Sequence, residues 1–260
     1  MSSFDAWCTR LRARADMPPV AVRAPLLLSS PPVPIGSVEP ALAQRMHDAG
    51  LPLRAAGDTW RIIGPADAAL AELARWLHAH GLGGRWRDEL LPVGDSAGEM
   101  RCAIERAAVR PLGITTHAVH LVGHRSGGEV WVQQRALNKA TDPGLWDTLV
   151  GGLVSAGETI AETLERETWE EAGLRLAELQ GLNDFGRITV RRPVSDGYMV
   201  EHIHLFEASV PAHAVPVNQD GEVECFEALS RADLQTRLRS EAFTLEASLI
   251  LAQWQARPHR

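Results

Sequence analysis

The stretch GGLVSAGETIAETLERETWEEAGL, residues 151–174, carries six glutamates and one arginine. Carboxylates four residues apart on a helix repel each other, at a cost of roughly 0.2–0.5 kcal/mol a pair. Glu167, Glu170 and Glu171 have the spacing i, i+3 and i+4, which places all three on one helix face. Such a face needs a cation among its carboxylates, so the segment predicts a cation site.

A hard divalent cation suits this face, because oxygen-rich clusters bind Mg²⁺ or Mn²⁺ where phosphate oxygens share the coordination. Arg166 precedes Glu167 and lies four residues before Glu170, so it can orient a carboxylate. Glycine at 151, 152 and 157 permits tight turns and close approach to a ligand, and Gly173 is placed to end the helix. A charged surface helix that binds nothing is the alternative, because charge runs commonly face solvent.

The spacing resembles the Nudix hydrolase signature in full: Gly152, five residues, Glu158, seven residues, then the remaining residues of the pattern, Arg166, Glu167, Glu170, Glu171, Gly173 and the apolar Leu174. Thr168 departs from it, since the signature favours a larger apolar side chain there.

The resemblance implies an α/β/α sandwich that cleaves a nucleoside or other diphosphate with the help of Mg²⁺ or Mn²⁺. It makes Glu167 and Glu171 the principal metal ligands, with Glu170 beside them and the Gly152 carbonyl as a further candidate. Arg166 would orient the glutamates, and Glu158 would support Arg166 and its loop.

Candidates outside the signature complete the expected site. A further carboxylate is expected from Glu201, or from Glu222 or Glu224, to complete the metal site or act as a base; a purely structural role is equally open for each. Arg135 and Lys139 could hold the substrate's diphosphate, with solvent exposure as the alternative. Two histidines, His202 and His204, alternate on one strand and are interpreted as strand surface.

The pattern along the chain predicts an α/β class protein of two domains, an N-terminal α/β domain at 1–110 and the Nudix domain at 111–260. Helices are expected at 36–47, 67–80, 99–110 and 243–255, the third bridging the domains. A further helix with an apolar stripe is expected near the N-terminus. Residues 116–135 read as a hairpin, and the stretch WDTLVGG as one strand. The arrangement is similar to a Nudix subgroup whose relatives act on thiamine diphosphate and its oxidised analogues.

Composition limits the function further. The net charge of −7 argues against a nucleic-acid partner, because phosphate binding needs a basic surface. Three scattered cysteines favour a reducing compartment, and no run is long enough to span a bilayer, so a cytoplasmic protein with a small-molecule diphosphate substrate and no membrane partner is expected. Nothing in the sequence indicates an oligomeric state.

Two other functions remain as alternatives. A diphosphate isomerase of the isopentenyl-diphosphate type shares the implied fold, but it needs a cysteine near residues 148–150, where the sequence reads Thr-Leu-Val. A non-catalytic diphosphate-binding module would be expected to have lost signature carboxylates, all of which are present. The N-terminal domain is expected to contribute to the substrate site, with Trp60 or Trp86 as a stacking surface for a planar ring. Trp76 is expected in the core by its helical spacing, and internal packing of all three is the alternative.

Overall fold

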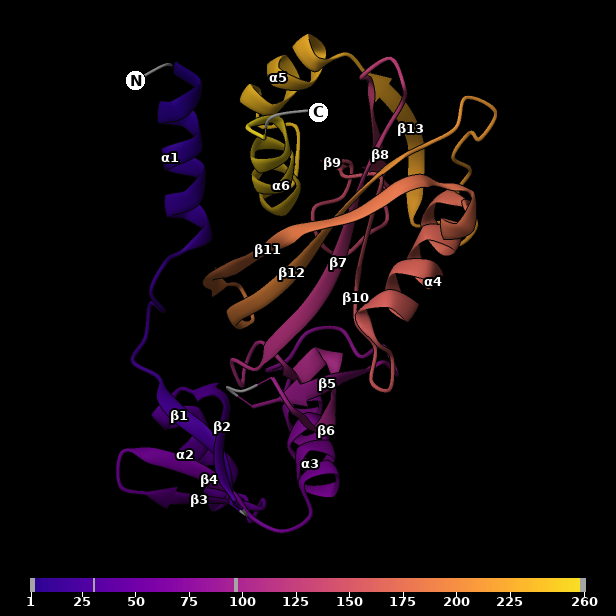
Figure 1. Ribbon diagram of the computed structural model, residues 1–260. Coiled ribbons are helices and arrows are strands. Elements are labelled where there is room, and N and C mark those ends of the chain that lie inside the picture. The colour runs from indigo at the N-terminus through magenta and orange to yellow at the C-terminus, as the bar shows by residue number, and fades with distance from the viewer. Residues whose placement is uncertain (1–2, 30, 96–97, 258–260) are drawn as a thin grey trace.

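The computed structural model describes residues 3–29, 31–95 and 98–257, and it places the chain in an elongated molecule with two units (Figure 1). The larger unit is built on a seven-stranded sheet. Its central path runs β11 (Gln180–Val194), β12 (Gly197–Ser209), β7 (Thr115–His124), β8 (Val130–Arg135) and β13 (Val223–Leu229). The shorter strands β9 (Trp146–Asp147) and β10 (Val150–Leu153) pair with β8 and β7 respectively.

Helices cover both faces of this sheet. One face packs under α4 (Ile160–Ala172), with Leu164 of the helix against Val119 and Leu121 of β7. The other face is covered by α1 (Ser3–Ala15), α5 (Arg231–Arg239) and α6 (Leu245–Gln255). The α/β/α sandwich with a smaller N-terminal α/β unit that the sequence predicts is confirmed.

The smaller unit holds a four-stranded sheet of order β2-β1-β4-β3 and two helices. Its elements are β1 (Ala24–Ser29), β2 (Pro32–Val38), α2 (Pro40–Asp48), β3 (Leu53–Ala56), β4 (Thr59–Ile62) and α3 (Ala66–Ala79). A separate hairpin of β5 (Leu90–Gly94) and β6 (Met100–Glu105) packs its buried Leu91 and Ile104 into the same core. Leu112 and Ile114, which lead into β7, lie in this core too, so the two units are continuously packed.

Helix α1 lies away from the rest of the N-terminal segment and packs on the larger unit (Figure 1). Its Trp7 and Leu11 are buried in the core that includes α6. The structure therefore differs from the predicted division at residue 110, because the first helix completes the sandwich. The predicted apolar stripe explains this placement, since a stripe of this kind must be covered by another element.

Three predicted elements are corrected. The helix expected at 99–110 is wrong: β6 occupies Met100–Glu105, because β5 needs a partner for its edge, and only a 3₁₀ turn, η1 (Arg106–Ala108), follows. The helix expected from residue 36 begins instead at Pro40, a residue suited to a first helical turn. The stretch WDTLVGG forms two strands, because the chain pairs with β8 at Trp146–Asp147 and then, after Thr148, with β7 at Val150–Leu153.

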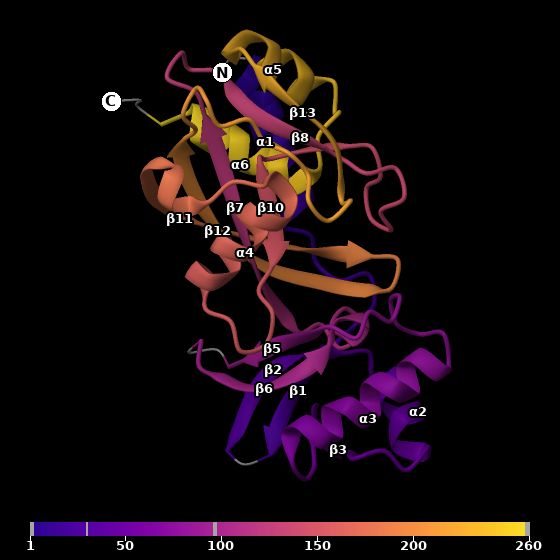
Figure 2. The ribbon, with the colours of Figure 1, turned by 90° about the vertical axis from the view of Figure 1, so that its right-hand side faces the viewer.

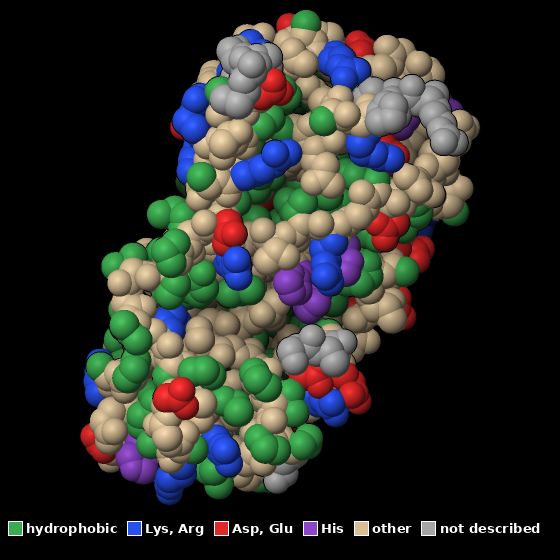
Figure 3. All heavy atoms as spheres, turned by 60° about the vertical axis from the view of Figure 1, so that its left-hand side comes forward, with side chains coloured by type: hydrophobic (Ala, Val, Ile, Leu, Met, Phe, Trp, Pro, Cys, Tyr) green, Lys and Arg blue, Asp and Glu red, His purple; other side chains and the backbone are tan. Residues whose placement is uncertain are grey.

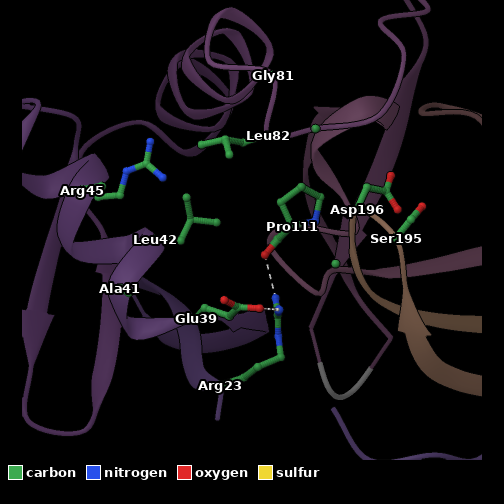
Figure 4. A pocket seen from close by; sticks show the side chains of 12 residues that line it. Arg23, Glu39, Ala41, Leu42, Arg45, Gly81, Leu82, Pro111, Ser195 and Asp196 are labelled. Carbon is green, nitrogen blue, oxygen red and sulfur yellow. Dashed lines mark hydrogen bonds and ion pairs between the residues drawn. The ribbon is translucent and has the colours of Figure 1, made fainter. Parts of the chain in front are cut away.

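The junction of the two units is held by polar contacts (Figure 4). The Arg23 guanidinium, nearly buried, donates to the Pro111 carbonyl at 2.6 Å and pairs with Glu39 at 3.8 Å. Arg110 pairs with Asp196 of the β11–β12 turn at 3.4 Å. A pocket of about 400 Å³ lies beside these contacts. No described helix is long and apolar enough to cross a bilayer.

Candidate active site

Helix α4 is fixed at both ends by its own sequence. Thr159 accepts a hydrogen bond from the Glu162 amide, and the Glu162 carboxylate accepts from the Thr159 amide, which makes a capping box. Gly173 ends the helix in the left-handed conformation, φ 62°, as predicted. Glu162 and Glu165 are both exposed, as expected of solvated glutamates.

Arg166 is the centre of a carboxylate network. Its Nε and Nη2 donate to the two Glu158 oxygens at 2.7 and 2.8 Å, and its Nη1 donates to Glu167 at 2.7 Å and Glu170 at 3.0 Å. Hydrogen bonding to Glu158 is the main reason that the pKa of Arg166 is raised, and the same bond lowers the pKa of Glu158. The contacts are those expected of an arginine that orients the signature glutamates.

Glu171 is buried, with 1% of its side chain exposed. Its carboxylate accepts hydrogen bonds from the Gly151 amide and from Gln133 Nε2, both at 2.8 Å, and Lys139 Nζ lies 3.4 Å away. Burial raises the pKa of Glu171 to about 7, which the Lys139 charge only partly offsets. Burial also raises the pKa of Glu167, despite the charge of Arg166. The positive charge nearby is therefore too small to offset the burial of Glu167 and Glu171.

The three helix carboxylates do not converge on one point. Glu171 accepts a hydrogen bond from Gln133 of the sheet, whereas Glu167 accepts one from Arg166. Glu170 keeps 41% of its side chain exposed. Among the described residues, no group of three or more His, Cys, Asp or Glu side chains is arranged to hold a metal ion. The carboxylate oxygens nevertheless suit a hard divalent cation. Burial raises the pKa of a carboxyl group by disfavouring its charged form, and a nearby positive charge stabilises that form.

The two glycines that open the signature have a steric role. A Cβ on Gly152 would lie 2.0 Å from the Glu167 carboxyl carbon, and one on Gly151 would lie 2.5 Å from the His120 ring. Any larger residue at Gly152 would therefore displace Glu167. The sequence predicted a carbonyl ligand at Gly152; the contact seen is this close approach of its backbone to a predicted metal ligand.

Both predicted substrate-binding cations lie beside these carboxylates and are already ion-paired. Lys139 Nζ contacts Glu222 at 2.5 Å as well as Glu171, and Arg135 pairs with Asp147 at 3.3 Å. Of the two predicted loop carboxylates, Glu222 therefore lies at the site, whereas Glu224 is exposed on β13 and is not among the cavity-lining residues.

A second group of carboxylates comes from β9, β12 and α6. Glu201 of β12 accepts a hydrogen bond from Thr116 at 3.1 Å. Glu246, which the sequence analysis missed, lies in the first turn of α6, and burial together with the charge of Glu201 raises its pKa to about 7. A sequence signal existed, because Glu246 is the one charged residue in a largely apolar helical stretch. Asp147 completes this group.

Most of these carboxylates border one cavity of about 1080 Å³ between the two units: Glu158, Glu167 and Glu170 from the α4 segment, with Asp147, Glu201, Glu222 and Glu246. Glu171 is buried and is not among the cavity-lining residues. The larger unit supplies its carboxylate face, and the smaller unit supplies residues from the segment before β5 and from η1. The ionisable side chains on the wall from the smaller unit are Arg85, Arg87, Glu89, Arg106 and Arg110. A volume of this size accommodates a small-molecule ligand.

The tryptophans expected to stack on a substrate ring do not line this cavity. Trp60 is buried in the N-terminal core, Trp76 stacks on His80 at 4.1 Å between ring centroids, and Trp86 packs against the same core. The stacking hypothesis is therefore wrong for Trp60 and Trp86, because the core of the smaller unit needs their apolar surface. Trp76 packs against this core, as its helical spacing predicts.

The histidine pair lies on the sheet and outside the cavity lining. His202 and His204 lie near His117 of β7, with ring centroids 5.5 and 5.8 Å from it. Histidine side chains gather beside basic ones on the corresponding face of the molecule (Figure 3). Burial, then the two neighbouring histidines, lowers the pKa of His117 to about 4. These rings are therefore neutral neighbours in a half-buried strand surface.

Comparisons with known proteins point to the same part of the chain. The NUDIX domain family matches residues 115–249, more than half of the 260-residue chain. The chain is 30% identical over 179 residues to Nudix hydrolase 20, chloroplastic, of Arabidopsis thaliana, covering 67% of this chain and 48% of that protein. It is 38% identical over 92 residues to an uncharacterized Nudix hydrolase of Pseudomonas aeruginosa, covering 35% of this chain and 54% of that protein.

The chain thus spans about half the length of the curated relatives it matches. Among solved structures, DR0079 of Deinococcus radiodurans is similar with a TM-score of 0.53 and 22% identity. That likeness covers 65% of this chain and 100% of the other, and at this identity it shows a shared fold alone.

Proposed function

Since the chain belongs to the Nudix family, we propose that it is a hydrolase that cleaves a diphosphate linkage in a small molecule with the help of Mg²⁺ or Mn²⁺. The observation that carries this proposal is the charge imbalance on α4. The buried carboxyl of Glu171, with its pKa raised to about 7, lies beside Glu167, whose pKa is also raised.

The proposed ligands are Glu167 and Glu171, with Glu170 and the Gly152 carbonyl as further candidates. When bound, a divalent cation would supply charge that offsets the phosphate oxygens and makes a nearby water more acidic. Arg166 would hold Glu167 and Glu170 in place from one side, while Glu158 fixes Arg166 through two hydrogen bonds. Such prearranged charge is the main protein contribution to phosphoryl chemistry.

The proton of the attacking water needs an acceptor on the cavity wall. We propose Glu201, which the sequence suggested as a base and which lines the cavity together with Glu246. The Glu246 carboxyl has a pKa of about 7, near the value at which a group both takes and releases protons at neutral pH. The two carboxyls interact electrostatically, so they would share this role as a pair.

The substrate is proposed in more detail than membership of the family implies. We keep thiamine diphosphate, its oxidised analogues, or a nucleoside diphosphate derivative as candidates, with the cytoplasm as the proposed location. The cavity is large enough for each of them. Release of monophosphate from a panel of these compounds, measured with Mg²⁺ and with excess chelator, tests both the activity and the substrate class.

The alternatives are less well supported. An isomerase would need a cysteine at the reacting group, and none of Cys8, Cys102 and Cys225 is among the cavity-lining residues. A non-catalytic module would gain nothing from keeping Glu171 buried beside Glu167, an arrangement that costs folding free energy.

A further inference from the structure

The smaller unit brings positive charge to the cavity wall that it shares with the α4 loop. The Ala156 amide donates to the Leu90 carbonyl at 2.8 Å, so β5 docks directly on the loop that carries Glu158. Figure 2 shows this hairpin beneath that loop. Arg87 and Arg106, from the chain segments on either side of the hairpin, line the cavity.

A buried carboxylate holds both arginine-bearing segments together. Glu105, 4% exposed, accepts hydrogen bonds from the backbone amides of Arg87 at 3.0 Å, Glu89 at 3.1 Å and Ala107 at 3.4 Å. Burying a carboxylate is costly unless it is hydrogen-bonded, so these amides repay the cost and fix the two segments against each other. The positions of both arginines are thereby set before any ligand arrives.

The backbone between Arg87 and Glu89 is strained. Asp88 has φ 57°, a left-handed conformation that costs a non-glycine residue on the order of 1 kcal/mol. Its carboxylate accepts from Trp86 Nε1 at 2.7 Å, which helps to hold it there. Strain of this kind is kept where the local geometry serves a purpose, and here it accompanies the turn of Arg87 toward the cavity.

The arginine charges are only partly neutralised. Arg106 pairs with Glu89 at 2.7 Å, whereas Arg87 makes no ion pair with any residue that the structure describes. Burial, and next the charge of Arg106, lowers the pKa of Arg87. Like charges held together in a partly buried wall are unfavourable, and an anion between them would relieve the repulsion.

This positive wall is continuous with the carboxylate face through Glu222. Burial would raise the pKa of Glu222, but its bond to Lys139 and the charges of Lys139, Arg106 and Arg87 lower it overall. Lys139 in turn contacts Glu171 on α4. A ligand that reaches from α4 past Lys139 would therefore meet Arg106 and Arg87 next.

We propose that Arg87 and Arg106, together with Lys139, form a phosphate-binding subsite that holds the phosphate of the diphosphate group farther from α4. This subsite rests on the proposed function and makes the smaller unit part of the reaction site. Its ligand is a phosphate or phosphonate oxyanion, which arginine recognises through paired N–H donors.

The test is calorimetric binding of methylenediphosphonate, a diphosphate analogue that is not hydrolysed, to the full chain in the presence of Mg²⁺. Arg87→Gln should weaken binding about tenfold or more, because a hydrogen bond to a charged group is lost. The matched control is Arg61→Gln, an exposed arginine on β4 outside the cavity lining, which should bind like the wild type.

Equal affinity in the wild type and Arg87→Gln would overturn the subsite. Arg106→Gln, with its fold checked by circular dichroism, should also weaken binding of the diphosphonate. The proposed function can fail independently of the subsite. If the chain hydrolyses no diphosphate but its binding of the diphosphonate still depends on Arg87, the function is refuted and the subsite is retained. Hydrolysis with the wild-type KM in Arg87→Gln would sink the subsite alone.

Discussion

Replacing Glu171 by glutamine removes a buried charge while keeping the side-chain volume, so it separates the stability cost of this carboxylate from its use. The carboxyl has a pKa of about 7 in the folded chain against an ordinary 4.5. At 1.36 kcal/mol for each pH unit, the difference corresponds to about 3 kcal/mol.

The sign follows from which state binds more protons. Between pH 4.5 and 7 the unfolded chain has lost this proton while the folded chain still holds it, so the free energy of unfolding falls as the pH rises. Above pH 7 the full cost is present, and below pH 4.5 there is none. Weaker hydrogen bonds from Gln133 and Gly151 to the new amide would take back about 1–2 kcal/mol.

We therefore expect metal-free Glu171→Gln to be more stable than the wild type by about 1–2 kcal/mol at pH 8.5. Near pH 4.5 the gain should be absent. Urea unfolding in chelator at both pH values measures this, and Glu165→Gln, at an exposed position on the same helix, is the control. With Mg²⁺, turnover of Glu171→Gln should fall by about 100-fold or more. A pH-independent change in stability, or near wild-type turnover, would refute the reasoning.

Three other variants test neighbouring parts of the account. Gly152→Ala should lower kcat by about tenfold or more, because its Cβ would displace Glu167; Gly127→Ala, where a Cβ meets open space, should not, and equal kinetics in both would contradict the steric role. Arg166→Lys should lower kcat about 10-fold to 100-fold and raise the Mg²⁺ concentration needed for half-maximal activity, since an ammonium cannot make the paired bonds to Glu158. Steady-state kinetics across Mg²⁺ concentrations measures both, and wild-type values would contradict the role of Arg166. A chain starting at Arg110 should lose several kcal/mol of unfolding free energy, because it lacks the buried face of α1, and a denaturation midpoint equal to that of the full chain would show otherwise.

Local spacing explains which parts of the site could be predicted. Arg166, Glu158, Glu167 and Glu170 lie within one helix and its preceding loop, so local geometry is enough to bring these four side chains into contact. The family and the α/β/α fold are confirmed for the same reason, since the signature is a local pattern with a fixed structural setting.

Long-range pairing explains what the sequence did not reveal. Glu246 and Asp147 come from separate segments, and only the docking of α6 beside β9 brings them to the cavity. The helix expected at 99–110 is a different kind of error, because residues 100–105 form the second strand of a local hairpin with β5. The stacking hypothesis failed because a tryptophan's apolar surface is as useful in a core as on a ligand.

The central claim is that the α4 carboxylates support metal-dependent cleavage of a diphosphate. The most direct measurement is release of monophosphate from the diphosphate panel by the full chain, with Mg²⁺, with excess chelator, and in Glu167→Gln. The account predicts turnover of at least one diphosphate that requires Mg²⁺ and falls by about 100-fold or more in Glu167→Gln. Turnover that persists in chelator, or that is unchanged in Glu167→Gln, would contradict it.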